Sequence, residues 1–559
     1  MKKRLWFYTT FFICVVLLYA GGRFYVARQE KEEWENLWKT NRSLPEDLDV
    51  HAYLSGNFAR QTGKADVALK AYLNALKKDP NNQSLRQEIY LLAMIQGQAP
   101  LFLPYLDKFT PQAKAEMMAD YVQVAHLIQQ GKTQQAVKVL TYKKTHPIDK
   151  LLVPLIKSWI YAKEGQRPQA FQILNELDEK KFAFAKGYQT FLLGAYFNDS
   201  SAIEKGIQQM QGKRLPAVGF FPLMKKYVAP NADLFQQYEK MVKNYPVTAD
   251  LIQFMGRQNL TFDTGLAEIF YFVSADEGNN LLDKKEALFL NSVALLLDPH
   301  KTLALIWGAE LTQALNLPQV SLLYYAHLPQ KNATLLFKQA HLMTLVNQSD
   351  KAMEILTSLK TTNQDNVPLL TLMAQIYTEK HQEHEALKLY DLILNQYAQK
   401  LDNKNLAKTH LMRANINYNL GRTDDLILDL EKAYILMPDD AMIQNDLGYN
   451  KLLQGQTDEG FELVQQAYQK NPKSPYILDS LAFAYSQKNQ FLVALPFAER
   501  ALELMPQSAL INMHLGDIYQ ALGRKREAQF QYKKALDLKT DLTPEMEKTL
   551  AQKSQFKRN

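Results

Sequence analysis

The C-terminal part of this chain repeats itself at a fixed step of 34 residues. Prolines recur at this step at Pro438, Pro472 and Pro506. Turn-forming residues recur at Gly421, Gly455, Asn489 and Gly523. Small residues recur in two series, which we call the packing residues: Ala414, Gly448, Ala482 and Gly516, and Ala433, Ala467, Ala501 and Ala535. A constant step of this length is typical of helical hairpins that stack on one another.

Each recurring position has a physical reason. Small side chains are expected where the two helices of a unit meet, because a close-packed interior does not absorb extra volume. Glycine suits the end of the first helix, where the backbone enters the left-handed region, and asparagine is the next best residue there. Proline ends the second helix. The sequence therefore predicts an all-α solenoid of helical hairpins, with the packing residues between the helices.

A less regular form of the pattern extends over most of the chain. A first unit runs from Gly56 to Pro80, and the turn glycines Gly131 and Gly165 are again one repeat apart. Residues 176–280 are the least regular, and we interpret them as degenerate helical pairs, with a small inserted domain as the alternative. The predicted organisation is a signal anchor or signal peptide (1–30), N-terminal repeats (31–175), degenerate helical repeats (176–330), repeats with a short insertion (331–406), a regular array (407–542), and a capping helix with a tail (543–559).

The N-terminus has the composition of a targeting segment. Lys2, Lys3 and Arg4 precede an uncharged apolar run, residues 5–22, whose length is near the minimum for a membrane-spanning helix. We favour an uncleaved single-pass anchor, with the solenoid on the periplasmic side because the short N-terminal tail is basic. Cleavage after the small residues Ala20 and Gly22, which would release the chain to the periplasm, is the alternative. A buried helix of the folded domain is the third interpretation.

Composition excludes some classes of site. The single cysteine, Cys14, excludes an intrachain disulfide and a cysteine-based zinc site. The net charge of +7 is small for 559 residues, and the charges of both signs are mixed. This mixture indicates a solvated surface, so no nucleic-acid partner is expected.

Residues 407–542 resemble tetratricopeptide (TPR) repeats in the spacing described above. The segments LGYNKLLQGQ, DSLAFAYSQ and HLGDIYQALGRKREAQFQYKKAL also resemble terminal repeats of bacterial envelope TPR proteins, in which a signal or anchor precedes a long array. The resemblance implies a TPR-type solenoid preceded by an apolar N-terminal helix. One membrane-anchored TPR family, which regulates lipopolysaccharide synthesis, ends in a four-cysteine metal module that this chain lacks.

The resemblance also implies which residues face the concave groove. They are Asn445, Asp446, Tyr449, Tyr476, Asp479, Phe483, His514 and Asp517. The TPR clamp for acidic tails uses Lys, Arg and Asn at such places, whereas this chain supplies aspartates and aromatic rings. We therefore expect an extended polar or basic segment as the partner. The alternative is that these residues are ordinary solvated helix positions.

Motifs for catalysis or metal binding are weak. Gly131, Lys132 and Thr133 resemble part of a phosphate-binding loop, but His126 stands where the loop needs its first glycine. His381 and His384 share a predicted turn with no third metal ligand evident. We expect no catalytic residues, no cofactor and no metal, and hence a protein that is not an enzyme.

Three functional hypotheses follow. The first is a membrane-anchored TPR scaffold or adaptor of the bacterial cell envelope, which binds partner proteins or extended segments in its groove and meets the membrane through residues 5–22. The second is an assembly or secretion factor for an exported polymer or an outer-membrane component. The third is an enzyme whose catalytic domain lies within residues 176–330.

Overall fold

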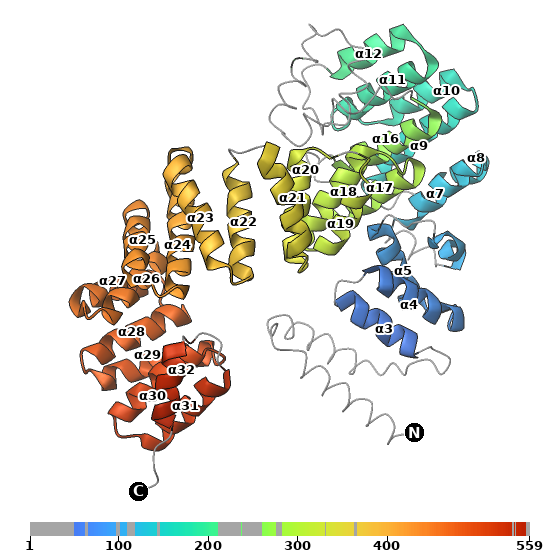
Figure 1. The fold of residues 1–559 in the computed structure, drawn as a ribbon. Coiled ribbons are helices and arrows are strands. Elements are labelled where there is room, and N and C mark those ends of the chain that lie inside the picture. The colour runs from blue at the N-terminus through green and yellow to red at the C-terminus, as the bar shows by residue number, and fades with distance from the viewer. Residues whose placement is uncertain are drawn as a thin grey trace, which may run out of the picture. The chain divides into compact units, whose positions relative to one another are not determined.

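The structure, a computed structural model, is helical throughout the part of the chain that it describes (Figure 1). It divides into two compact units, Met1–Asn332 and Ala333–Asn559. The described residues are 50–61, 65–96, 101–108, 118–141, 146–210, 236, 260–275, 282–329, 331–362, 366–538, 542 and 544–554. The all-α helical-hairpin fold expected from the sequence is thus confirmed in these ranges. The expected apolar helix at residues 5–22 lies outside them. Among the helices that are described, none has the length and apolar character needed to span a bilayer.

Unit 1 consists of successive helical pairs: α3 packs on α4, α7 on α8, α11 on α12, α16 on α17, and α18 on α19. Its elements are α3 (Val50–Gln61), α4 (Ala65–Lys78), α5 (Gln83–Ile95), η2 (Leu103–Lys108), α7 (Ala119–Gln129), α8 (Thr133–Thr141), α9 (Asp149–Lys163), α10 (Arg167–Gln172), η3 (Ile173–Glu176), α11 (Ala183–Phe197), α12 (Ser200–Met210), α16 (Phe262–Ala275), α17 (Lys284–Leu297), α18 (Thr302–Ala314) and α19 (Pro318–Ala326).

Helices far apart in the sequence also meet in unit 1. Helix α16 packs against α9, and α17 packs against α5 and α7 (Figure 1). The fully buried indole of Trp159 lies against Gly265 of α16, where an added Cβ would come within 2.0 Å of the ring. On α17, the hydroxyl of Ser292 donates to the carbonyl of Met94 at 2.6 Å. Unit 1 therefore closes on itself, whereas a simple solenoid contacts only its sequence neighbours.

Unit 2 is a regular stack of hairpins. Each second helix contacts the first helix of the next pair, up to the final helix α32 (Figure 1). The pairs are α20 (Ala333–Leu345) with α21 (Ser349–Thr362), α22 (Val367–Glu379) with α23 (Glu383–Leu392), α24 (Asn403–Asn419) with α25 (Thr423–Leu436), α26 (Ala441–Leu453) with α27 (Thr457–Lys470), α28 (Pro475–Gln487) with α29 (Phe491–Leu504), and α30 (Ala509–Ala521) with α31 (Lys525–Leu538); α32 is Pro544–Ser554.

The turns of unit 2 have the expected backbone. Gly421, Gly455 and Gly523 have φ of +69°, +81° and +76°, and Asn489 has +58°. The predicted left-handed ends of the first helices are therefore confirmed. The insertion before α24 continues the helical path: a π-helical turn at Ile393–Tyr397 and a 3₁₀ turn at Ala398–Lys400 lead to Asp402, whose side chain caps α24.

The packing residues lie in the core of unit 2. The six alanines among them are at most 2% exposed. Helices α26 and α27 approach closely at a pair of glycines, where a Cβ on Gly460 would lie 2.7 Å from the carbonyl oxygen of Gly448. A Cβ on Gly516 would lie 2.5 Å from the ring of Tyr532. Larger side chains at these places would force the paired helices apart.

A first prediction concerns Gly460→Ala. In an open helix this change would stabilise by about 1 kcal/mol, because alanine is the better helix former. Here the new methyl group meets backbone atoms, so we expect a local destabilisation of about 1–3 kcal/mol. Hydrogen exchange of the α26 and α27 amides measures the effect. Glu462→Ala, at an exposed position of the same helix, is the control and should leave the exchange almost unchanged.

Candidate functional site

The first helices of the C-terminal hairpins form one continuous inner face in unit 2. Helix α26 packs against α28, and α28 against α30, whereas contacts between the second helices α27 and α29 are sparser. A helical array curves toward the side on which its helices are closer together, and such proteins bind their partners on that side. The eight residues predicted to line the groove lie on the three helices α26, α28 and α30.

Three aromatic side chains meet at the centre of the inner face. Tyr449 of α26, Phe483 of α28 and His514 of α30 come from three successive units. The ring centroids of Tyr449 and Phe483 are 5.3 Å apart, and Phe483 stacks on His514 at 4.9 Å. The Tyr449 hydroxyl lies 3.4 Å from Nε2 of His514. The cluster therefore links helices that are two repeats apart.

A buried ion pair supports this aromatic cluster. Nδ1 of His514 lies 2.9 Å from Oδ2 of Asp479, and each residue is 4% exposed. Burial alone would lower the pKa of His514, but the charge and hydrogen bond of Asp479, together with the charge of Asp517, outweigh it and raise that pKa. Asp479 thus favours the protonated form of His514 and orients its ring.

Two acceptor atoms on α26 and α28 have no donor among the described residues. Oδ1 of Asp479 and Oδ1 of Asn445 are buried and make no hydrogen bond within the described part of the chain. A buried acceptor without a partner costs about 1–3 kcal/mol, so most folded proteins avoid it. The Oδ1 atoms of Asp479 and Asn445 therefore remain able to accept a hydrogen bond.

Asp446 carries a charge that is not balanced by a cation. The residue is half-buried on α26, and its carboxylate accepts from Nδ2 of Asn445 at 3.2 Å. Burial is the main cause that raises its pKa; the Asn445 hydrogen bond lowers the pKa, the charge of Asp440 raises it, and the net result is a pKa of about 6. The described residues supply no ion-pair partner to this carboxylate. Perturbed carboxylates of this kind cluster at functional sites.

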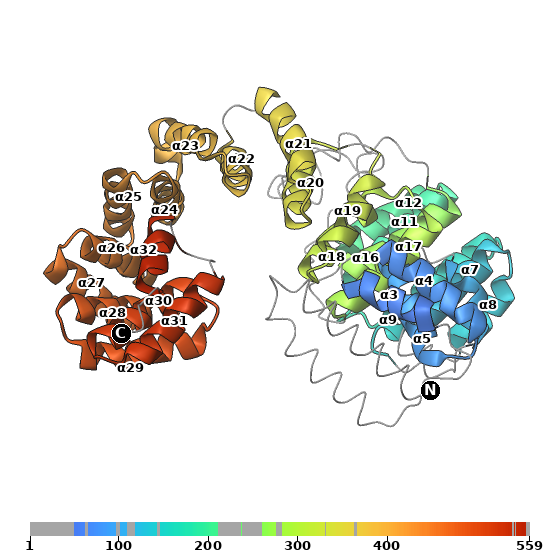
Figure 2. The ribbon, with the colours of Figure 1, turned by 60° about the horizontal axis from the view of Figure 1, so that its bottom comes forward.

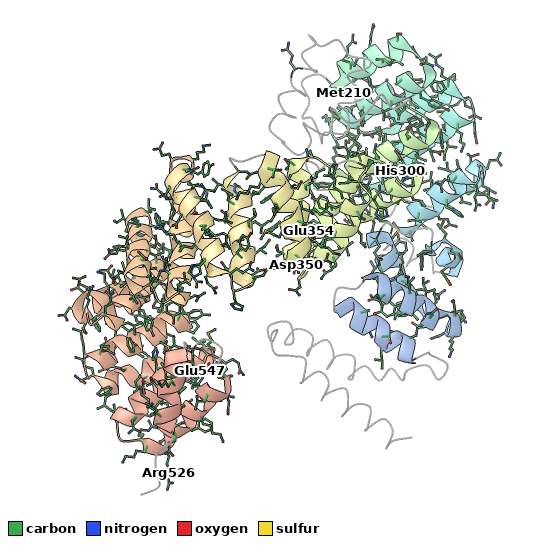
Figure 3. The ribbon with its side chains drawn as sticks, in the orientation of Figure 1. Met210, His300, Asp350, Glu354, Arg526 and Glu547 are labelled. Carbon is green, nitrogen blue, oxygen red and sulfur yellow. The ribbon has the colours of Figure 1, made fainter. Side chains whose placement is uncertain are left out.

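The remaining predicted groove residues lie at the margins of the face. Tyr476, at the start of α28, is 50% exposed. Asp517 of α30 accepts from the hydroxyl of Tyr532 at 2.7 Å and pairs with Nζ of Lys553 on α32, also at 2.7 Å. Figures 1 and 2 both place α32 beside α30 and α31, and Figure 3 marks α32 by Glu547 and α31 by Arg526. The repeat spacing did not predict that Lys553 of α32 would form an ion pair with Asp517.

A second polar network in unit 2 was also missed. Asp429 of α25 is fully buried and accepts from Nδ1 of His410 at 2.8 Å and from Nε of Arg413 at 2.8 Å. Arg413 also reaches Asp391 of the preceding pair at 2.7 Å. Burial raises the pKa of Asp429, but the hydrogen bonds from His410 and Arg413 outweigh it and lower the pKa overall. The spacing of His410, Arg413 and Asn417 along one helix face was the available signal. The network holds three helices together.

The weak motifs for chemistry fall at turns. Gly131 has φ of +75° between α7 and α8, and the hydroxyl of Thr133 donates to Glu164 at 2.7 Å. This segment is a helix–turn–helix junction, as the sequence analysis interpreted it. His381 lies in the turn before α23 with a side chain that is 91% exposed. Within the described ranges, no three His, Cys, Asp or Glu side chains are grouped so that they could hold a metal ion.

Comparisons with known proteins identify the repeat. Residues 509–542, which span α30 and α31, match the family model described as tetratricopeptide repeat. A TPR repeat-containing protein of Pseudomonas aeruginosa is 27% identical over 184 residues, which are 32% of this chain and 30% of that protein. Human aspartyl/asparaginyl beta-hydroxylase is 25% identical over 109 residues, 19% of this chain and 14% of that protein. The chain therefore spans less than a third of either relative. The APC/C hetero-tetramer Cut9–Hcn1 has a TM-score of 0.37 at 12% identity, covering 92% of this chain and 97% of that one.

A second prediction concerns Asp446→Asn. The folded chain holds the Asp446 proton more tightly than the unfolded chain does, so this residue makes the fold less stable as the pH rises from about 4 through about 6. The neutral amide removes this effect. The quantity compared is the free energy of unfolding of the variant minus that of the unchanged chain. We expect this difference to be about 1 kcal/mol larger at pH 7.5 than at pH 5.

Hydrogen exchange of the α26 and α28 amides, corrected for the intrinsic effect of pH on exchange, measures this difference. Asp458→Asn is the control, because the Asp458 side chain is 90% exposed and Lys488 lowers the pKa of its carboxyl. A relative stability of Asp446→Asn that does not change with pH would contradict the prediction.

Proposed function

Because the chain carries tetratricopeptide repeats, we propose that it is a membrane-anchored scaffold of the bacterial cell envelope. It binds partner proteins, or extended segments of them, along the inner face of α26, α28 and α30. The observation that carries this proposal is the continuity of that face. It includes the exposed Tyr476, the carboxylate of Asp446, and the aromatic cluster around Tyr449 and Phe483. TPR domains bind proteins or peptides, and stacked repeats offer them an extended inner surface.

The chemistry of the inner face favours an extended polar or basic partner segment. Its side chains are aromatic or acidic, and the cations His514 and Lys553 are already engaged by Asp479 and Asp517. An acidic tail would meet Asp446 without a compensating cation. A segment with basic side chains would gain charge complementarity, which favours the correct partner over others.

The membrane part of the proposal rests on the sequence. The basic residues before the apolar run 5–22 support a single-pass anchor with the repeats on the periplasmic side. Secretion to the periplasm after cleavage of the run is the alternative. An anchor would hold the repeats near the membrane and raise the local concentration of bound partners.

Two other functions remain as alternatives. An assembly or secretion factor for an exported polymer or an outer-membrane component would use the same inner face on a different partner. We propose binding rather than catalysis as the mechanism. An enzyme within residues 176–330 would need a polar reactive cluster. A buried polar group is described in this range. Glu268 accepts from the Tyr188 hydroxyl at 2.6 Å and pairs with Lys301, so this group joins three segments of the core.

A third prediction tests the scaffold. A photo-crosslinking amino acid in place of Tyr476, on the inner face, should capture discrete partner proteins in living cells. The same amino acid in place of Leu492 is the control, because Leu492 is 77% exposed but lies on the second helix, α29. Mass spectrometry identifies the captured proteins. Equal capture at both positions, or capture at Leu492 alone, would contradict binding through the inner face.

A fourth prediction tests the anchor. The full chain should stay with the membrane after extraction with alkaline carbonate, since an apolar span resists removal by salt and high pH. A variant that lacks residues 1–30 should be released. Mass spectrometry of the mature protein should find peptides from residues 5–22. Release of the full chain, or a mature N-terminus after Gly22, would favour the secreted alternative.

A further inference from the structure

One carboxylate on the inner face of unit 2 differs from its neighbours. Asp479 is paired with His514, and Asp517 is paired with Lys553. Asp446 lies on the same face, half-buried, and its one described side-chain donor is the neutral amide of Asn445. With His514 protonated, both pairs are neutral, so Asp446 leaves this stretch of the face with one uncompensated negative charge. A cation supplied from outside would remove the cost of this arrangement.

Two acceptors without a described donor lie on the same pair of helices, α26 and α28. Asn445 precedes Asp446 on α26, and Asp479 occupies the equivalent place in the next repeat, 34 residues later on α28. Since α26 packs against α28, equivalent places on the two helices are neighbours along the face. The unpartnered Oδ1 atoms of Asn445 and Asp479 are both buried, and both residues are 4% exposed. Together with Asp446 they offer acceptors for several N–H donors of a ligand.

Aromatic rings border the same place. Tyr449 follows Asn445 and Asp446 by one helical turn, so it lies on the same side of α26, and its ring contacts Phe483. The faces of such rings attract cations. The neighbouring repeat contains a cation that contacts both a carboxylate and an aromatic ring. Lys553 pairs with Asp517, and its ammonium lies 5.9 Å from the ring centroid of Tyr532.

We propose that Asn445, Asp446 and Asp479, bordered by Tyr449 and Phe483, form a subsite that binds an arginine side chain of the partner segment. This inference deepens the proposed scaffold function and rests on it. A planar guanidinium suits the site because it carries five N–H donors and stacks on aromatic rings, whereas an ammonium offers three donors and no plane. The partially accessible Asp446 attracts the guanidinium first. The two buried oxygens are reached once the inner-face side chains adjust around it.

The proposed subsite also predicts how binding changes with pH. Asp440 and Asn445 act on the carboxyl of Asp446, while Asp479, Asp517 and Lys553 act on His514. Acidification from pH 7.5 to pH 5 protonates Asp446 and removes the charge that attracts the arginine. The affinity for an arginine-bearing segment should therefore fall over this interval, and the fall should be smaller when residue 446 is asparagine.

The test uses the full chain in detergent and two fluorescein-labelled peptides of glycine, serine and glutamine. One peptide carries arginine at every third position, so that any register presents one, and the other carries the uncharged isostere citrulline at the same positions. Fluorescence anisotropy measures the affinities at pH 7.5. We expect the arginine peptide to bind about tenfold more tightly, because hydrogen bonds from a charged donor to a carboxylate are stronger than neutral ones.

Asp446→Asn should reduce this preference to about twofold or less, and Asp458→Asn, which removes an equal but exposed charge, should leave it intact. Equal affinities for the two peptides, absence of binding by the arginine peptide, or an undiminished preference in Asp446→Asn would overturn the subsite. The crosslinking at Tyr476 separates this failure from that of the scaffold. Partners captured there without an arginine preference would leave the scaffold standing and remove only the subsite.

Discussion

The close approach of paired helices is the constraint on which unit 2 depends. At Gly448 and Gly460 the backbones of α26 and α27 nearly touch, and at Ala467 and Ala501 even the methyl groups are fully buried. Such contacts leave no freedom for a helix to slide or roll, because a shift would bring backbone atoms into collision. Each hairpin is thus a rigid element, and the left-handed residues at its turn set the direction in which the second helix returns.

This rigidity is what makes the inner face chemically unusual. Side chains on α26, α28 and α30 are held in register, so Tyr449 can reach His514 two repeats away and Asp479 can favour the protonated form of that histidine. Among the described residues, the same register leaves Oδ1 of Asn445 and Oδ1 of Asp479 buried without donors, and Asp446 without a cation. In a more flexible structure these side chains would rotate into the solvent and be hydrated. Retaining them costs stability, and such costs are common where a protein binds something.

The sequence predicted those features that follow from local geometry. The turn glycines and Asn489 could be foreseen, because a left-handed residue must end each first helix. A capping helix was expected within residues 543–559, and α32 is found at Pro544–Ser554. The predicted groove residues lie on α26, α28 and α30, but spacing alone could not show that Asp479 and His514 form a buried pair, or that Lys553 pairs with Asp517. These contacts depend on the curvature of the array, which no single repeat encodes.

Unit 1 shows the same limit in a stronger form. The packing of α16 on α9 and of α17 on α5 and α7 joins segments more than a hundred residues apart, and no fixed spacing marks these partners. Trp159 and Gly265 are complementary in shape, but either residue alone is unremarkable in the sequence. The network around Asp429 was hidden for a related reason, because its acceptor lies on a different helix from its donors.

The central claim is that the inner face of unit 2 is the docking surface. Hydrogen exchange of the full chain, with and without its captured partner, tests this claim most directly, because it reports every helix of the array in one measurement. The account predicts that the partner slows exchange in α26, α28 and α30 more than in their paired helices α27, α29 and α31. Protection confined to the second helices, or to unit 1, would contradict it.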